Sequence, residues 1–207
     1  MFSITASCRI VKPLLLSGGV FIYHEKCQDA QNLSWRVLVD EKVNTLPVRT
    51  SALCRQMGIH LAYGKQGLTS DGYCTILNDS MYIIIRKGLP LVQTRFIVAH
   101  EMGHILLGHV GICHLINRKQ LNLKCFTEIE CEANVFASCL LAPACVLWGC
   151  GVCEAGEIAA LCEISLQVAE ERANHLMLLY GQDNFLTSPL EQQVYKQFCP
   201  FIHSHRQ

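Results

Sequence analysis

The sequence lacks three features, each of which would define a class of protein. Its 17 Lys and Arg residues cancel its 17 Asp and Glu residues, so no net charge draws the chain to nucleic acid or to an anionic membrane. Charged residues make up only 16% of the chain and hydrophobic residues 51%, which excludes a disordered protein. No uninterrupted apolar run reaches the roughly 18 residues that a membrane-spanning helix requires. The 207 residues therefore predict a globular protein without repeats.

A convincing secretion signal is also missing. Arg9 and Lys12 precede an apolar run at residues 14–16, but Ser17 and two glycines interrupt it, and no small-residue cleavage site follows. We therefore expect a cytoplasmic protein.

Cysteine, in contrast, is plentiful. The 13 cysteines cannot all pair within one chain because their number is odd. In a reducing cytoplasm we expect them to remain thiols and to pack as small apolar side chains. Cys150 and Cys153 form the one C-x-x-C pair, but with no second pair and no His pair beside it the motif favours packing over a zinc or redox site.

Periodicity and turn residues divide the chain into three predicted parts. Residues 1–34 show no clear period and are interpreted as an N-terminal extension, residues 35–148 as a core, and residues 149–207 as a helical region. Within the core we expect two short helices around Leu46-Pro47, then a strand at 60–63, a hairpin of strands 73–77 and 80–86, and a long apolar helix from about Gln93.

The long helix carries a metal-binding motif, His100-Glu101-Met-Gly-His104. Two histidines four residues apart share one helix face, so both imidazoles can bind one zinc ion. Glu101 is rotated away from that face and stands beside the metal, where it can take a proton from the attacking water. The apolar residues around this trio indicate a buried helix, in which unpaired polar groups would be costly.

A catalytic zinc site needs a third protein ligand. The next helical pattern offers Glu128, Glu130 and Glu132. Glu130 and Asn134 share a helix face, so Glu130 can bind zinc while Asn134 accepts a hydrogen bond from a ligating imidazole. Glu130 is the predicted ligand and Glu132 the reserve, while Cys131 remains a less favoured alternative.

His109 is a further histidine close to the motif. It lies on roughly the same side of the helix as His100 but nine residues on, beyond the metal's reach, and Gly108 can already end the helix. We interpret His109 as a helix-end residue and not as a ligand.

These motifs resemble the ImmA/IrrE family of metallopeptidases. The resemblance runs from about Trp35 to Phe201 and is most specific between Asp71 and Pro143, with Ala142 where the family usually has Met. It implies an α+β fold: a small zincin-like core with a short antiparallel or mixed sheet, the motif helix and a Glu-bearing helix, followed by a helix-turn-helix-like C-terminal region. It also implies Zn²⁺ held by His100, His104 and Glu130, with Glu101 catalytic.

The resemblance implies a substrate too, a helix-turn-helix repressor of a phage, mobile element or stress response that is cleaved by this zinc endopeptidase. Such peptidases bind substrate as an extended strand on a sheet edge, and strand 80–86 is the predicted edge. A zinc-fold binding module that sequesters a repressor or toxin without cutting it is the alternative, although a pure binder has no need for Glu101 as a base.

Direct DNA binding through the C-terminal helices is a third and disfavoured hypothesis. The segment 154–179 carries five Glu residues but Arg172 alone as a basic residue, so contact with phosphates is not expected and a protein partner is favoured. The sequence predicts no membrane contact and leaves the oligomeric state open.

Overall fold

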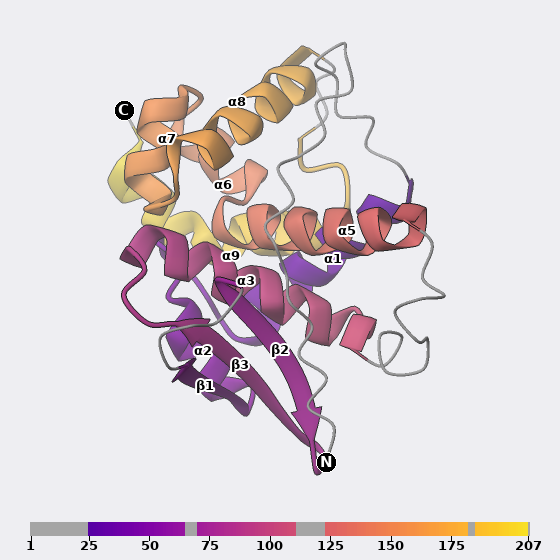
Figure 1. Ribbon diagram of the computed structural model, residues 1–207. Helices are drawn as coiled ribbons and strands as arrows, with labels where there is room; N and C mark the ends of the chain where they lie inside the picture. Colours follow the sequence, from indigo (N-terminus) through magenta and orange to yellow (C-terminus); the bar gives the residue numbers. More distant parts are fainter. Residues whose placement is uncertain (1–24, 65–69, 111–122, 182–184, 207) are drawn as a thin grey trace.

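The computed structural model describes residues 25–64, 70–110, 123–181 and 185–206 (Figure 1). The fold is α+β, as predicted, with a small mixed sheet and many helices. In chain order the elements are α1 (Glu25–Asp40), α2 (Thr50–Gln56), β1 (Ile59–Gly64), β2 (Gly72–Leu77), β3 (Ser80–Arg86), α3 (Leu91–Leu106), α5 (Leu123–Leu141), α6 (Ala144–Cys150), α7 (Ala155–Cys162), α8 (Leu166–Gly181) and α9 (Pro189–His205).

Helix α1 begins at Glu25, inside the segment interpreted as an extension, and residues 1–24 lie outside the described residues. Its buried side chains include Cys27, Ala30, Trp35 and Leu38. Their spacing is helical, but small residues such as Cys and Ala give a weak apolar signal, which is why the first half of this helix was not predicted from the sequence.

The three-stranded sheet has the order β1-β3-β2. Strand β3 pairs with β2 in an antiparallel hairpin, and Asn78 and Asp79 make the turn with positive φ angles of 49° and 58°. On its other side β3 pairs in parallel with β1. The prediction that β3 forms an exposed edge was therefore wrong. Parallel strands are joined by a long connection, so sequence adjacency does not reveal the pair.

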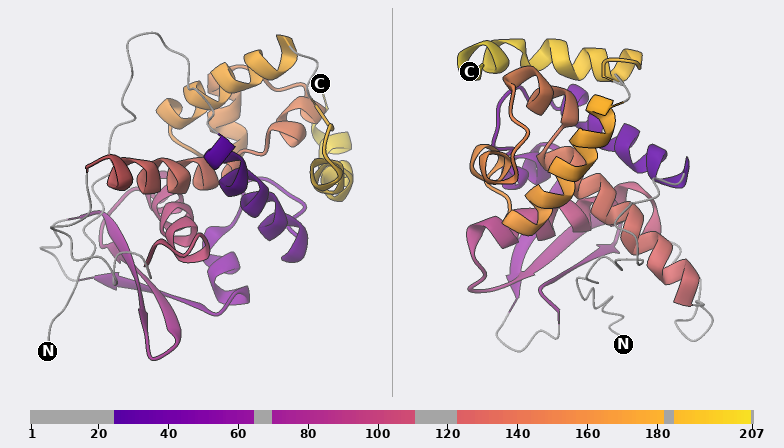
Figure 2. Two further views of the ribbon diagram at one scale, coloured as in Figure 1. Left: turned by 90° about the vertical axis from the view of Figure 1, so that its right-hand side faces the viewer. Right: turned by 90° about the horizontal axis from the view of Figure 1, so that it is seen from above.

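Helix α3 lies between the sheet and α5 (Figures 1 and 2). It packs on β2 and β3 on one side and crosses α5 on the other. Gly103 makes the crossing close: a Cβ at this position would stand 3.0 Å from a ring carbon of Phe136, which is fully buried on α5. This close approach brings the predicted ligands of the two helices to one place.

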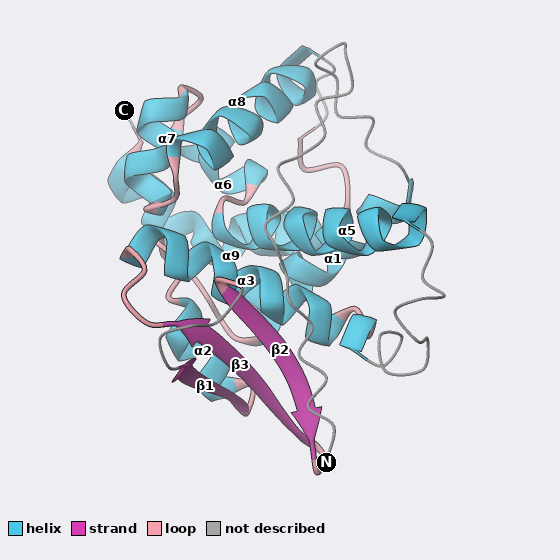
Figure 3. Cartoon of the chain, viewed as in Figure 1, coloured by secondary structure: helices cyan, strands magenta, loops and turns pink. Residues whose placement is uncertain are grey.

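The C-terminal helices cover the far side of α5, and α9 runs along α1 and α6 (Figure 3). The predicted end of the core at residue 148 falls inside helix α6. Arg172 of α8 donates two hydrogen bonds to the carbonyl oxygen of Ala142, at 3.0 and 2.7 Å. Arg95 of α3 donates to the carbonyl oxygen of Glu163, at 2.6 Å, and also binds its carboxylate. These buried arginines join the two predicted parts.

Among the described residues, one helical stretch, Glu128–Cys150, stands out for its length and apolar composition. It is long and apolar enough to cross a membrane, but 83% of its most apolar window is buried inside the protein, where α5 and α6 form the centre of the core.

Buried thiols also contribute to the core of the protein. Burial raises the pKa of Cys54 to about 11 and that of Cys162 to about 12, so both thiols stay protonated at neutral pH.

Candidate metal centre

His100 and His104 lie one turn apart on α3, and their Nε2 atoms are 3.1 Å from each other. Both residues are buried, at 4% and 7% exposure. Each ring has its other nitrogen, Nδ1, engaged with a different neighbour. The Nε2 atoms are therefore the ones that remain to face a common point.

Glu130 of α5 supplies a third donor group. Its carboxylate oxygens lie 3.4 Å from Nε2 of His100 and 3.5 Å from Nε2 of His104, and the residue is 5% exposed. Among the described residues these three side chains form the group of possible metal ligands, with one donor atom of each within 4.8 Å of the others. The structure thus places the three predicted ligands together.

The spacing of these donor atoms fits tetrahedral coordination of one metal ion. Two ligands about 2.05 Å from zinc at the tetrahedral angle are roughly 3.3 Å apart. The separations of 3.1, 3.4 and 3.5 Å lie on either side of this value. Two imidazoles and one carboxylate leave the fourth position free, which is the arrangement of a catalytic zinc site and not of a structural one.

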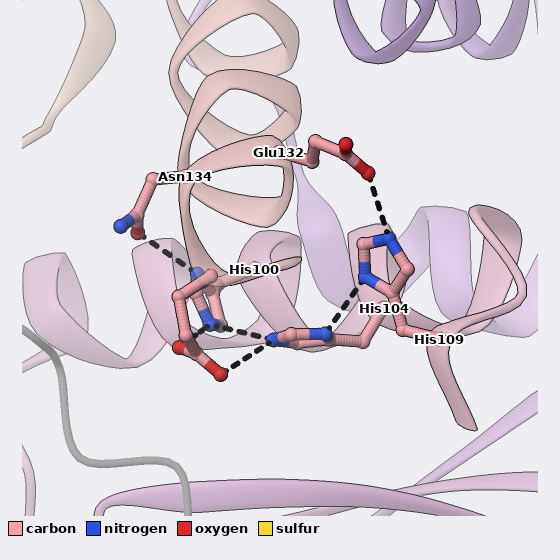
Figure 4. Close-up of polar contacts among 6 residues, drawn as sticks. His100, His104, His109, Glu132 and Asn134 are labelled. Carbon is pink, nitrogen blue, oxygen red and sulfur yellow. Dashed lines mark hydrogen bonds and ion pairs between the residues drawn. The ribbon is translucent and has the colours of Figure 1, made fainter. Parts of the chain in front are cut away.

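Asn134 lies where the sequence predicts it. Its side-chain oxygen is 2.9 Å from Nδ1 of His100 (Figure 4). Because the amide oxygen only accepts, the neutral imidazole carries its proton on Nδ1 and leaves the lone pair on Nε2. The hydrogen bond therefore fixes the tautomer that a metal ligand needs.

The remaining candidates have other partners. The carboxylate of Glu132, the reserve ligand, lies 3.0 Å from Nε2 of His109, and Nδ1 of His109 lies 3.0 Å from Nδ1 of His104. The thiol of Cys131 contacts Cys27 of α1, with their sulfur atoms 4.0 Å apart. The link from His109 to His104 was missed in the sequence, where Gly108 directly before His109 was the one signal of a chain reversal.

The electrostatics of the cluster, with no metal ion present, show strong competition between burial and charge. Burial lowers the pKa of His100, but the hydrogen bond to Glu130 and the charges of Glu101 and Glu130 outweigh it and the net shift is upward. Burial lowers the pKa of His104 well below its usual value, and the neighbouring imidazoles add to this. A neutral His104 is the form that binds metal.

Glu101 is 2% exposed and lies against β2. Burial raises the pKa of its carboxyl group, while the charge of His100 and hydrogen bonds from the thiol and backbone of Cys74 oppose the rise. Cys74 belongs to β2, which is an edge strand of the sheet in the described residues. A carboxyl group is thus held beside His100 and Glu130 without being one of the three donors, where it could accept a proton.

The fold and the three donors define a protein of the metallopeptidase type. The chain belongs to the peptidase family with an IrrE N-terminal-like domain, whose model matches residues 54–174. This match covers more than half of the chain and includes all the site residues described above, and it confirms the resemblance seen in the sequence. A search of curated proteins found no match to the chain.

Proposed function

We propose that this protein is a zinc-dependent endopeptidase. The observation that carries the proposal is the convergence of His100, His104 and Glu130 with the buried carboxylate of Glu101 beside them. Nitrogen and carboxylate donors in tetrahedral spacing suit zinc among the common divalent ions. A zinc ion, when bound, lowers the pKa of water and polarises a carbonyl group.

Glu101 would act as the general base and then as the general acid. Its carboxylate takes a proton from the attacking water molecule and returns it to the amine of the leaving peptide. Burial raises the pKa of the Glu101 carboxyl group. A carboxylate of higher pKa is a stronger base towards the attacking water.

The substrate would bind as an extended strand along β2. This strand ends the described sheet and contacts Glu101 through Cys74, so a peptide added to its free edge would pass next to the site. Ile76 and Leu77, in the second half of β2, are exposed at 39% and 57%. These exposed apolar side chains favour pairing with an extended segment of another protein.

The proposed substrate is a helix-turn-helix repressor of a mobile element, phage or stress response, met in the cytoplasm. Membership of the family supports this class. Helices α7 and α8 expose acidic side chains, since Glu154, Glu157 and Glu170 are exposed and Arg172, the one basic residue of segment 154–179, is buried. A basic DNA-binding protein is complementary in charge to these side chains.

Mass spectrometry of a cleavage reaction tests the proposal. The zinc-loaded protein is incubated with the helix-turn-helix proteins encoded beside its gene and with a degenerate peptide library, and Glu101→Gln serves as the matched variant. We expect defined fragments from the wild type and a loss on the order of 10²–10⁴-fold in rate for Glu101→Gln at equal zinc content.

Two outcomes would contradict the proposal. Cleavage at an unchanged rate by zinc-loaded Glu101→Gln would remove the base from the mechanism. Intact repressors and intact peptides after incubation with the zinc-loaded wild type would mean that the site does not cut, and a stable complex with a repressor would then favour the sequestering module.

A further inference from the structure

A second imidazole and a carboxylate continue outward from His104. Nδ1 of His104 is 3.0 Å from Nδ1 of His109, and Nε2 of His109 is 3.0 Å from a carboxylate oxygen of Glu132 (Figure 4). His104, His109 and Glu132 are referred to below as the outer relay. His109 is 3% exposed, so both of its nitrogens are satisfied inside the protein and not by water.

The end of α3 creates this arrangement. The helix ends at Leu106, and Gly108 has a φ angle of +76°, the left-handed conformation that reverses the chain after a helix. The backbone N–H of Leu107 still donates to Gly103, and the chain then folds back so that the ring of His109 lies edge-on to that of His104, with centroids 5.1 Å apart. No atom within 4 Å would meet a Cβ at residue 108, so its conformation and not space calls for glycine.

When Nε2 of His104 binds a metal, the protons of the two imidazoles in the outer relay can be placed in one way only. The proton of neutral His104 then sits on Nδ1 and donates to Nδ1 of His109, which must be an acceptor. His109 therefore carries its own proton on Nε2, where it donates to the carboxylate of Glu132. Each N–H group of the outer relay then has an acceptor. No lone pair of His109 is left to bind the metal.

We propose that His109 and Glu132 are positioning residues, which hold His104 in the metal-binding tautomer and ring orientation by way of a hydrogen-bonded imidazole. The inference rests on the proposed metal site. It gives each histidine ligand its own outer acceptor, Asn134 for His100 and His109 for His104. Outer partners of this kind typically contribute 10–100-fold to metal affinity.

Two amide variants at residue 109 separate positioning from packing. In His109→Asn the side-chain oxygen can occupy the place of Nδ1 and still accept from His104. In His109→Gln the amide reaches the place of Nε2, keeps the contact with Glu132 and leaves Nδ1–H of His104 without an acceptor. The two side chains are both polar and similar in size, so a packing effect alone would not rank them in this order.

The experiment measures zinc affinity by competition with a chromophoric chelator, which needs no substrate. We expect affinity about 10–100-fold weaker for His109→Gln and His109→Phe, and within a few-fold of the wild type for His109→Asn. Glu132→Gln, whose amide oxygen can still accept from His109, should lose less than His109→Gln. ¹⁵N spectra of labelled histidine should show the Nδ1 proton of zinc-bound His104 in the wild type and in His109→Asn.

A variant on a different helix serves as the control. His175→Gln alters a partly buried histidine on α8, outside the outer relay, and should leave zinc affinity unchanged. Circular dichroism at the temperature of the titration tests whether each variant is folded. If His109→Phe does not fold, the comparison of His109→Asn with His109→Gln still tests the positioning role.

Three results would overturn the outer relay. They are equal zinc affinity in His109→Gln and the wild type, an affinity in His109→Asn as weak as in His109→Gln, and a zinc-bound His104 that lacks a proton on Nδ1. In each case a wild type that binds zinc and cuts peptides leaves the endopeptidase proposal standing. A wild type that binds no zinc would instead end both.

Discussion

The amide oxygen of Asn134 lies 2.9 Å from Nδ1 of His100, so one residue of α5 orients a ligand on α3 while Glu130, one turn earlier on α5, provides another. The metal site therefore spans a helix crossing, and its geometry depends on how closely the two helices approach at Gly103 and Phe136.

Asn134 gives the first prediction. Asn134→Leu keeps the branched shape of the side chain but removes the oxygen that accepts from Nδ1–H of His100, so zinc affinity should fall about 10–100-fold. Asn134→Asp keeps an acceptor and should bind zinc far more tightly than Asn134→Leu. Competition titration of the two variants is the measurement, and equal affinities would show that the amide does not orient His100.

The packing of α9 on α6 gives the second. A Cβ on Gly149 would stand 2.7 Å from a ring carbon of Tyr195 and 2.9 Å from a methyl carbon of Ile202. Overpacking costs about 1–3 kcal/mol, and the helix propensity of Ala returns up to about 1 kcal/mol, so Gly149→Ala should destabilise the fold by about 1 kcal/mol.

Gly156 is the matched control for this substitution. It is also helical, it is exposed, and nothing lies within 4 Å of the place of its Cβ. Gly156→Ala should therefore be neutral or stabilising by up to about 1 kcal/mol. Urea denaturation of both variants is the measurement, and a Gly149→Ala protein at least as stable as the wild type would contradict the close packing of α9.

The pair Cys150 and Cys153 gives the third. Cys150 is fully buried, its pKa raised by burial, whereas Cys153 is exposed. Because Cys150→Ser buries a hydroxyl group in an apolar setting, we expect it to cost about 1–3 kcal/mol, and Cys153→Ser to cost less than about 0.5 kcal/mol. Neither substitution should change zinc content. Loss of zinc from both variants would restore the C-x-x-C motif as a metal site.

The pH dependence of stability gives the fourth. Burial lowers the pKa of His175 to about 3 from an ordinary 6.5. Between these two pH values the unfolded chain binds a proton that the folded protein does not, so the free energy of unfolding falls as pH falls from 6.5 towards 3. His175→Gln removes this term, and its stability should decline less steeply, by at most about 1.4 kcal/mol per pH unit.

Urea denaturation at pH values between 4 and 7 measures the two slopes, after His175→Gln is shown to be folded at neutral pH. Parallel slopes for the wild type and the variant would show that His175 is protonated in the folded protein as readily as in the unfolded one.

Local spacing explains what could be predicted from the sequence. His100 and His104 share a face because they are four residues apart on a helix, and the same holds for Glu130 and Asn134. The structure brings the two pairs together. The turn residues Asn78 and Asp79 likewise predicted the hairpin of β2 and β3.

Non-local pairing explains what could not. The parallel partner of β3 is β1, which is separated from it by the whole of β2, so β3 was wrongly predicted to be an edge. His109 was interpreted as a helix-end residue because it lies nine residues after His100, beyond the metal's reach along a continuous helix, and because Gly108 can end that helix. The left-handed turn at Gly108 brings it back onto His104, and periodicity does not encode such a reversal.

The metal content of ligand variants tests the central claim most directly. Wild type, His100→Ala, Glu130→Ala and Glu101→Gln are dialysed against the same free zinc concentration, and zinc per chain is measured by plasma mass spectrometry. We predict about one zinc ion per chain for the wild type and Glu101→Gln, and little or none for the two ligand variants. No zinc in the wild type, or as much zinc in Glu130→Ala as in the wild type, would contradict the site described here.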